Sequence, residues 1–92
     1  MSYQYASTLF ATLEAACDTC LYDWLTAGGQ NDDGDAAEYL TNESTDALLQ
    51  EMANDDWSWP EDAGQVDVRD AIERLRERIE YVGDCPVGFD LD

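Results

Sequence analysis

The sequence has no histidine, no lysine and only four arginines, against 22 aspartates and glutamates. Its formal net charge at pH 7 is -18 over 92 residues. A protein that binds DNA, RNA or an anionic membrane needs Lys and Arg clusters that neutralise phosphates. The charge therefore excludes direct binding to nucleic acid or to an anionic membrane surface.

The missing histidines and lysines also restrict the catalytic chemistry that side chains can supply. Without His there is no usual neutral-pH base and no Ser/His or Cys/His nucleophile, and without Lys there is no Schiff-base amine. Pairs of carboxylates occur by chance in so acidic a chain. We expect that the protein is not an enzyme and that it holds no cofactor and no metal.

Three cysteines and one aspartate-rich segment are the candidates for metal or redox chemistry. Cys17 and Cys20 form a CxxC and Cys85 is a third thiol, but structural zinc needs four ligands and a redox CxxC begins a helix. This one falls within an apolar helical pattern, which favours buried core residues. If Gly34 is aligned with position six of an EF-hand loop, the end positions are Gly29 and Leu40, so both end carboxylates are missing. Residues 31–35 therefore favour a solvated turn.

No run of about 18 apolar residues occurs, and the N-terminus lacks the basic region of a secretory signal. We therefore expect a soluble, cytoplasmic protein. Hydrophobic residues make up 45% of the chain, which is too many for a wholly disordered protein. The length favours one acidic helical domain over residues 1–92.

Apolar residues at three- and four-residue spacing predict helices over 6–27, 35–40, 44–54 and 67–82. The expected N-caps are Ser7 or Thr8, Asp35, Ser44 or Thr45, and Asp67, and the expected stops include Gly28-Gly29 and Gly83. Residues 55–64 read as a loop, and the tail after Cys85 is expected to be irregular or extended and to fold back. The predicted fold class is all-α, a small bundle of three to four helices.

All four arginines lie between residues 69 and 78, within the last predicted helix. Four-residue spacing predicts three ion pairs on its surface, Arg69 with Glu73, Asp70 with Arg74 and Arg76 with Glu80. We therefore expect structural roles for the arginines. The apolar spacing of this helix also leaves homodimerisation open.

The size of the charge is unusual for so small a domain. Duplex DNA has one negative charge per ~1.7 Å of axis, so the net charge of 18 matches roughly 31 Å of duplex. A chain of this length has a radius of gyration near ~12 Å and a diameter of roughly 30 Å. Acids four or seven residues apart on a helix lie about 6 or 10.5 Å apart, similar to neighbouring backbone phosphates.

In size, charge and helical character the whole chain resembles the small acidic DNA-mimic inhibitors encoded by phages and plasmids, which include anti-restriction and anti-CRISPR proteins. The resemblance implies a partner with a basic groove, a nucleic-acid-binding protein or ribonucleoprotein such as a CRISPR effector in a bacterial host cell, from which DNA is displaced. The partner-binding residues expected on this hypothesis are Glu14, Asp18, Asp23, Asp32, Asp33, Asp35, Glu38, Glu43, Asp46, Glu51, Asp55, Asp56, Trp57 and Trp59.

Two other functions fit the same composition. An acidic adaptor or antitoxin would neutralise a basic partner protein without competing with DNA. A halophilic cytoplasmic protein would have this charge as a salt adaptation, in keeping with 14 Asp, 8 Glu and no Lys.

Aromatic side chains are the expected anchors of the interface, namely Tyr22, Tyr39, Trp57 and Trp59, with core packing as the alternative role of the two tryptophans. The sequence also suggests a test, in which reversal of Asp32, Asp33 and Asp35 to Lys abolishes inhibition without unfolding the domain.

Overall fold

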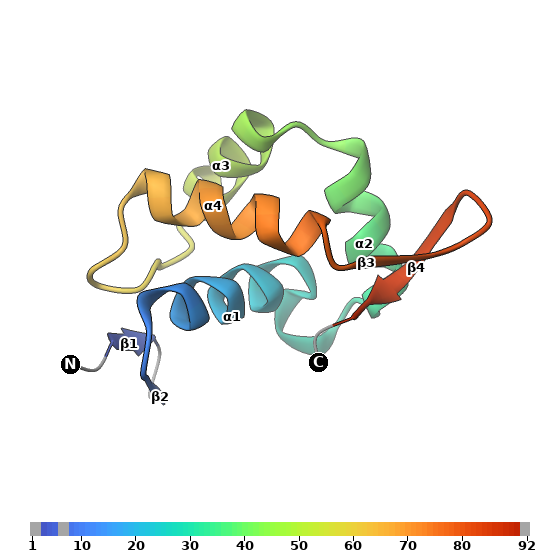
Figure 1. Ribbon diagram of the computed structural model, residues 1–92. Coiled ribbons are helices and arrows are strands. Elements are labelled where there is room, and N and C mark those ends of the chain that lie inside the picture. Colours follow the sequence, from blue (N-terminus) through green and yellow to red (C-terminus); the bar gives the residue numbers. More distant parts are fainter. Residues whose placement is uncertain (1–2, 6–7, 91–92) are drawn as a thin grey trace.

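The computed structural model describes residues 3–5 and 8–90, and this part of the chain has four α-helices and two β-hairpins (Figure 1). The elements are β1 (Tyr3–Tyr5), β2 (Thr8–Phe10), α1 (Leu13–Leu25), the 3-10 turn η1 (Ala27–Gly29), α2 (Asp33–Asn42), α3 (Thr45–Asn54), α4 (Gln65–Arg76), β3 (Ile79–Val82) and β4 (Cys85–Phe89). The predicted all-α class is wrong, because both ends of the described chain form antiparallel hairpins.

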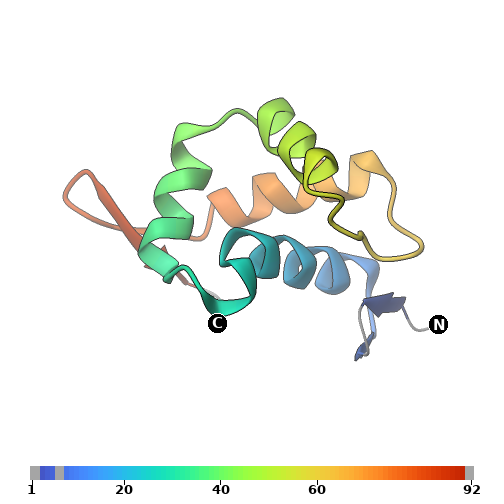
Figure 2. The same ribbon diagram turned by 180° about the vertical axis from the view of Figure 1, so that it is seen from behind.

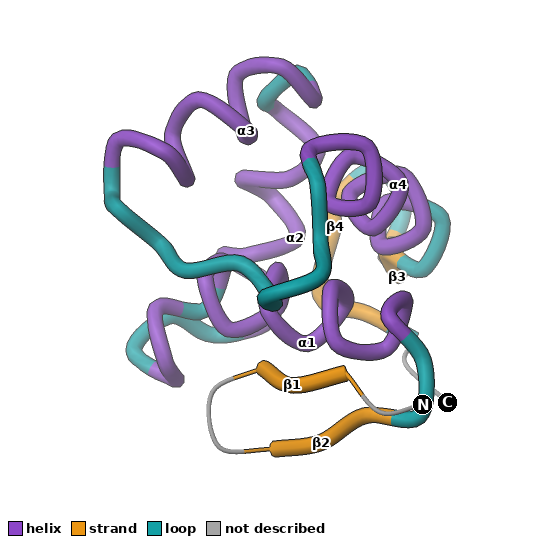
Figure 3. Tube along the Cα trace, turned by 90° about the vertical axis from the view of Figure 1, so that its left-hand side faces the viewer, coloured by secondary structure: helices purple, strands orange, loops and turns teal. Residues whose placement is uncertain are grey.

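The helices form the body of the molecule and the hairpins lie at its two ends. Figure 1 shows α1 and α4 side by side and running in the same direction, with α3 against α4. Seen from behind, α2 lies at the end of this pair that the β3–β4 hairpin covers (Figure 2). The β1–β2 hairpin packs on α1 at the opposite end (Figure 3). The radius of gyration is 12.7 Å, as expected from the chain length.

The first helix begins later than the spacing predicts. Thr12 is the N-cap of α1, and its hydroxyl accepts the Ala15 N–H at 3.1 Å. Residues 8–10 instead pair with 3–5, and Leu9 is 67% exposed, so it contributes nothing to the apolar helix face. Of the two predicted caps, Thr8 is in β2 and Ser7 lies outside the described residues.

The last helix begins and ends earlier than predicted. It starts at Gln65, and Asp67 contributes from its third position by accepting the Gly64 N–H at 2.8 Å. It ends at Arg76, and residues 79–82 pair with 85–89 around a turn in which Gly83 has a φ of 64°. Glycine adopts this conformation at little cost. The predicted fold-back of the tail is confirmed as β4.

Of the two middle helices, α3 follows its predicted cap and α2 does not. Ser44 caps α3 by accepting the Ala47 N–H at 3.2 Å, and α3 ends at Asn54 as predicted. Asp32, rather than Asp35, caps α2, because its carboxylate accepts the Asp35 N–H at 2.8 Å. The shift by three residues makes α2 longer at its start and gives Asp32 a structural role.

The core lies where the four helices meet. The largest side chains that are fully buried are Leu21, Leu40, Leu48, Met52, Ile72, Val68, Cys17 and Cys20. Ile79 and Phe89 extend the core into the second hairpin, and the Tyr22 and Phe89 rings meet edge to face at 6.1 Å. Among the described residues, no helix is long and apolar enough to cross a membrane.

Three arginines of α4 join it to the other three helices. Arg69 pairs with Asp46 of α3, and Arg74 donates to Asp18 of α1 at 2.8 Å. Both partners are far away in sequence, so the predicted pairs of Arg69 with Glu73 and of Asp70 with Arg74 are wrong. The structural role is confirmed for Arg69, Arg74 and Arg76 but not for Arg78, and the Arg69 and Arg74 ion pairs join different helices.

Arg76 makes the largest set of contacts. Its guanidinium donates to the carbonyl oxygens of Leu40 and Glu43 and to the Thr45 hydroxyl, at the junction between α2 and α3. The last carbonyls of a helix have no partner within the helix, so Arg76 satisfies groups that α2 leaves free. It also pairs with Glu73 at 3.2 Å, instead of with Glu80 as predicted.

Replacing Arg76 by Ala should lower the free energy of unfolding by about 1–3 kcal/mol, because partly buried carbonyls lose their donors. Urea unfolding followed by circular dichroism measures this difference. Arg78→Ala is the matched control, since within the described residues the Arg78 side chain makes no hydrogen bond or ion pair. Equal destabilisation by both variants would contradict the role of Arg76 as a helix connector.

Candidate functional site

The structure divides the twelve predicted acidic contact residues into two groups. Six hold the fold together: Asp18 and Asp46 pair with arginines, Asp32 caps α2, and Asp23, Asp33 and Asp55 accept hydrogen bonds from the side chains of Tyr5, Tyr22 and Trp24. Within the described chain, six make no side-chain hydrogen bond or ion pair: Glu14, Asp35, Glu38, Glu43, Glu51 and Asp56. The second group is free to meet a partner.

Four predicted acids lie near one aromatic ring. Burial, followed by the charges of Glu51, Glu43 and Asp55, raises the pKa of Tyr39. Asp35 lines the same shallow depression as Tyr39 and Asp55. We call these four acids with Tyr39 the Tyr39 face. The Tyr39 face contains residues of α2, residues of α3 and Asp55, which follows α3. Residues far apart in sequence thus form one negative surface.

A second aromatic ring fixes the geometry of this face. Trp24 of α1 packs on Tyr39 with ring centroids 5.9 Å apart, and its indole N–H donates to Asp55 Oδ2 at 3.0 Å. Asp55 is thereby held against the body of the molecule, while Glu43 and Glu51 stay available. The predicted anchor Tyr39 does lie among acids.

The predicted anchor Tyr22 is already engaged inside the molecule. Its hydroxyl donates to Asp33 and its ring contacts Phe89, so it joins α1 to α2 and β4. The Asp33 hydrogen bond is the main cause of the raised pKa of Tyr22. Reversing Asp32, Asp33 and Asp35 to Lys would therefore remove a helix cap and this acceptor, and a loss of inhibition would not identify a contact.

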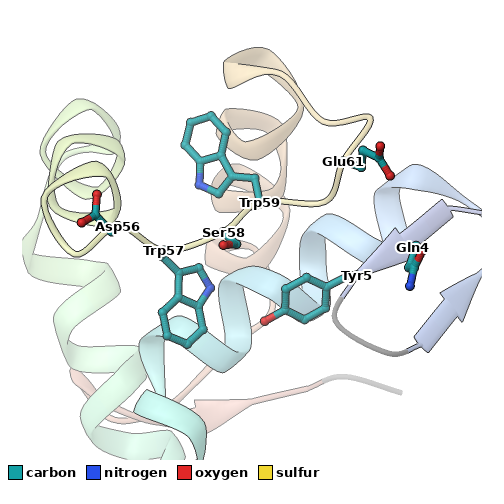
Figure 4. A pocket seen from close by; sticks show the side chains of 7 residues that line it. All are labelled: Gln4, Tyr5, Asp56, Trp57, Ser58, Trp59 and Glu61. Atoms are coloured by element: carbon teal, nitrogen blue, oxygen red, sulfur yellow. The ribbon is translucent and has the colours of Figure 1, made fainter.

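Trp57 and Trp59 line an open pocket of about 650 Å³ between the 55–64 loop and the N-terminal hairpin (Figure 4). The lining residues are Gln4, Tyr5, Asp56, Trp57, Ser58, Trp59 and Glu61. Both tryptophans are half-buried and pack against the core, in agreement with the alternative role given to them. Both residues also line the pocket, so packing and binding are compatible.

The end of α3 sets the position of this pocket. Asp56 has a φ of 54°, its N–H donates to Ala53 O, and the Trp57 N–H donates to Met52 O at 3.1 Å. This pair of hydrogen bonds is a Schellman ending, with an aspartate where glycine is usual. Farther along, Cys20 Sγ donates to Ser58 O at 3.4 Å, which fixes the loop to α1.

Sequence reasoning missed Gln4, Tyr5 and Glu61 as pocket residues. Gln4 and Tyr5 belong to β1, a strand that helical spacing does not reveal. Glu61 follows a Trp-Pro pair in the loop, and its nearness to Trp59 was the one available signal. Burial raises the pKa of Tyr5, whose hydroxyl donates to Asp23 Oδ2 at 3.1 Å, so Tyr5 remains protonated.

The cysteines do not form a reactive or metal-binding centre in the described part of the chain. Cys17 and Cys20 lie on the core face of α1, as expected, and burial raises the pKa of each thiol to about 11. All three cysteines are free and only Cys85 is exposed. Among residues 3–5 and 8–90, no three His, Cys, Asp or Glu side chains converge in a way that could hold a metal ion.

Comparison with known proteins gives no relative. No family model matches the chain, and neither a curated protein nor a solved structure matches it. The function must therefore be argued from the surface described above.

Thiol labelling should separate the buried pair from Cys85. At pH 8 a disulfide reagent should modify one thiol per folded chain rapidly, because a thiolate reacts and the Cys17 and Cys20 thiols stay protonated and covered. In urea all three thiols should react. A Cys85→Ser variant should show no rapid phase when folded. Rapid reaction of that variant would contradict the burial of the CxxC.

Proposed function

We propose that the protein is a DNA-mimic inhibitor that binds the basic groove of a nucleic-acid-binding protein and competes with DNA. The strongest support is that most arginines are engaged in contacts within the fold, while several acids have no side-chain partner. Two of the four arginines form ion pairs between helices and a third, Arg76, is hydrogen-bonded to the junction of α2 and α3. Glu38, Glu43 and Glu51 remain without a side-chain partner in the described chain. The surface offered to a partner is therefore almost entirely anionic.

The dimensions support the same proposal. The molecule measures 41 × 29 × 24 Å, and its net charge equals that of roughly 31 Å of duplex DNA. The charge per length is thus close to that of the polymer it would replace. Helices hold these acids in fixed positions, so a basic groove meets an ordered array of negative charge rather than a flexible acidic tail.

The most specific form of the proposal is an anti-CRISPR protein that occupies the DNA-binding site of a CRISPR effector. The support is the small size of the chain, which suits a single basic groove. In that case it would work in the cytoplasm of a bacterial host cell, and its partner would be a ribonucleoprotein.

Competition with DNA is the decisive measurement. The immobilised protein should capture a DNA-binding protein from bacterial lysate at ~0.15 M salt, where charges act over about 8 Å. Excess duplex DNA should prevent this capture, and the captured protein should lose its own DNA binding when the free chain is added. Salt should slow association, because electrostatic steering weakens with ionic strength.

Other outcomes would contradict the proposal. Capture that DNA leaves unchanged would favour an acidic adaptor or antitoxin. A chain that is unfolded at this salt concentration and folds only at high salt would favour a halophilic protein.

The Tyr39 face should contribute more to binding than acids elsewhere. The triple variant D35N/E43Q/E51Q should bind the captured protein about tenfold more weakly, a loss of ~1.4 kcal/mol. The control D84N/E77Q/E80Q removes the same number of charges from the end of α4 and the β3–β4 hairpin. Both affinities are measured by surface plasmon resonance, and equal losses would show that this face is not the contact.

A further inference from the structure

At the Trp57–Trp59 pocket the acidic surface opens onto aromatic rings. Within the described structure, the buried indole nitrogen of Trp59 has no hydrogen-bond partner, whereas the indole N–H of Trp57 lies beside the Tyr5 hydroxyl and Cys20. A buried donor without an acceptor costs about 1–3 kcal/mol. The Trp59 donor therefore favours an occupant that also brings a hydrogen-bond acceptor, such as a peptide carbonyl.

Figure 4 shows how the groups are arranged. The Trp57 ring and Tyr5 face each other across the pocket, with the indole nitrogen of Trp57 on the side of Tyr5. The side chains of Asp56 and Glu61 lie at opposite ends. Neither carboxylate has a hydrogen-bond or ion-pair partner in the described chain.

These groups select the chemistry of a ligand. An anion is repelled by Asp56, by Glu61 and by the net charge of -18. A purely apolar ligand would leave both carboxylates without partners. A cation on the aromatic rings gains a cation–π interaction and the attraction of the carboxylates. Because a guanidinium has no acceptor, the unpaired indole N–H needs a second group, and a peptide carbonyl next to the cation in the ligand is a neutral acceptor.

We propose that this pocket receives an arginine side chain of the partner protein, with the guanidinium against the aromatic rings and attracted by the carboxylates of Asp56 and Glu61. Arginine fits better than lysine because its planar, weakly hydrated guanidinium stacks on rings and keeps donors free for carboxylates. The inference rests on the proposed function, since a protein with a basic groove presents such side chains. It adds a specific contact to an otherwise long-range attraction.

A small probe tests the pocket without the partner. N-acetyl-arginine amide is titrated into the labelled protein, and the indole N–H resonances of its three tryptophans are followed by NMR at constant ionic strength. The Trp57 and Trp59 resonances should shift in a saturable way. Trp24 is an internal control, because its indole N–H already donates to Asp55. N-acetyl-citrulline amide, which has the same shape without the charge, should give no saturable shift.

Variants of the two carboxylates test the charge requirement. D56N/E61Q should bind the arginine probe about fivefold more weakly, whereas D84N/E77Q should bind it like the wild type. Asn is chosen at residue 56 because it tolerates the left-handed backbone found there. Equal binding of citrulline and arginine, equal shifts of all three tryptophans, or no shift at all would overturn the proposal.

The two proposals can fail separately. If DNA-sensitive capture occurs and the arginine probe does not bind, the pocket inference is wrong and the DNA-mimic function stands. If the probe binds and capture is absent or insensitive to DNA, the pocket stands as an arginine site and the DNA-mimic function fails.

Discussion

The fold depends on placing its few positive charges between helices. A net charge of -18 opposes compaction, and the chain has no lysine with which to offset it. The arginines of α4 act at three separate contacts, Arg69 with α3, Arg74 with α1 and Arg76 with the junction of α2 and α3. A surface ion pair alone is worth little, but each of these three arginine contacts joins α4 to another element. α4 is thus the element around which the acidic helices can assemble.

This use of the arginines determines the character of the surface. A guanidinium held between helices neutralises a carboxylate that folding would otherwise bring close to others, and little positive charge is left outside. Arg78 is exposed and makes no side-chain hydrogen bond or ion pair within the described chain. The acids that face solvent therefore have few cations near them. Stability and surface charge follow from the same few contacts.

The helix over 44–54 could be predicted because its signals are local. Ser44 offers a cap, and Leu48, Leu49 and Met52 mark one buried face. The hairpins could not be found in this way. Leu9 and Val82 fit helical spacing by coincidence, yet they are 67% and 70% exposed. What makes their segments strands is pairing with another segment, which spacing within one segment does not reveal.

The candidate site, too, could be predicted only where its features are local in sequence. That Trp57 and Trp59 sit between acids follows directly from the sequence, and so does their place in a loop. Their pairing with Tyr5 across a pocket depends on β1 and on the left-handed Asp56 that ends α3. Likewise, Asp32 and Asp33 look free in sequence, although one caps a helix and the other accepts the Tyr22 hydroxyl. Three-dimensional contacts decide which acids remain available.

Charge alone would make the proposed inhibitor indiscriminate, since every protein with a basic groove attracts so acidic a molecule. Electrostatic attraction mainly raises the rate of association, and it is weakened by salt. The lifetime of a complex depends on a few well-packed contacts, in which tryptophan, tyrosine and arginine are prominent. The Trp57–Trp59 pocket supplies the aromatic half of such a contact next to two unpaired carboxylates. An arginine at the matching position would then distinguish one basic groove from another, a discrimination that the anionic surface cannot provide.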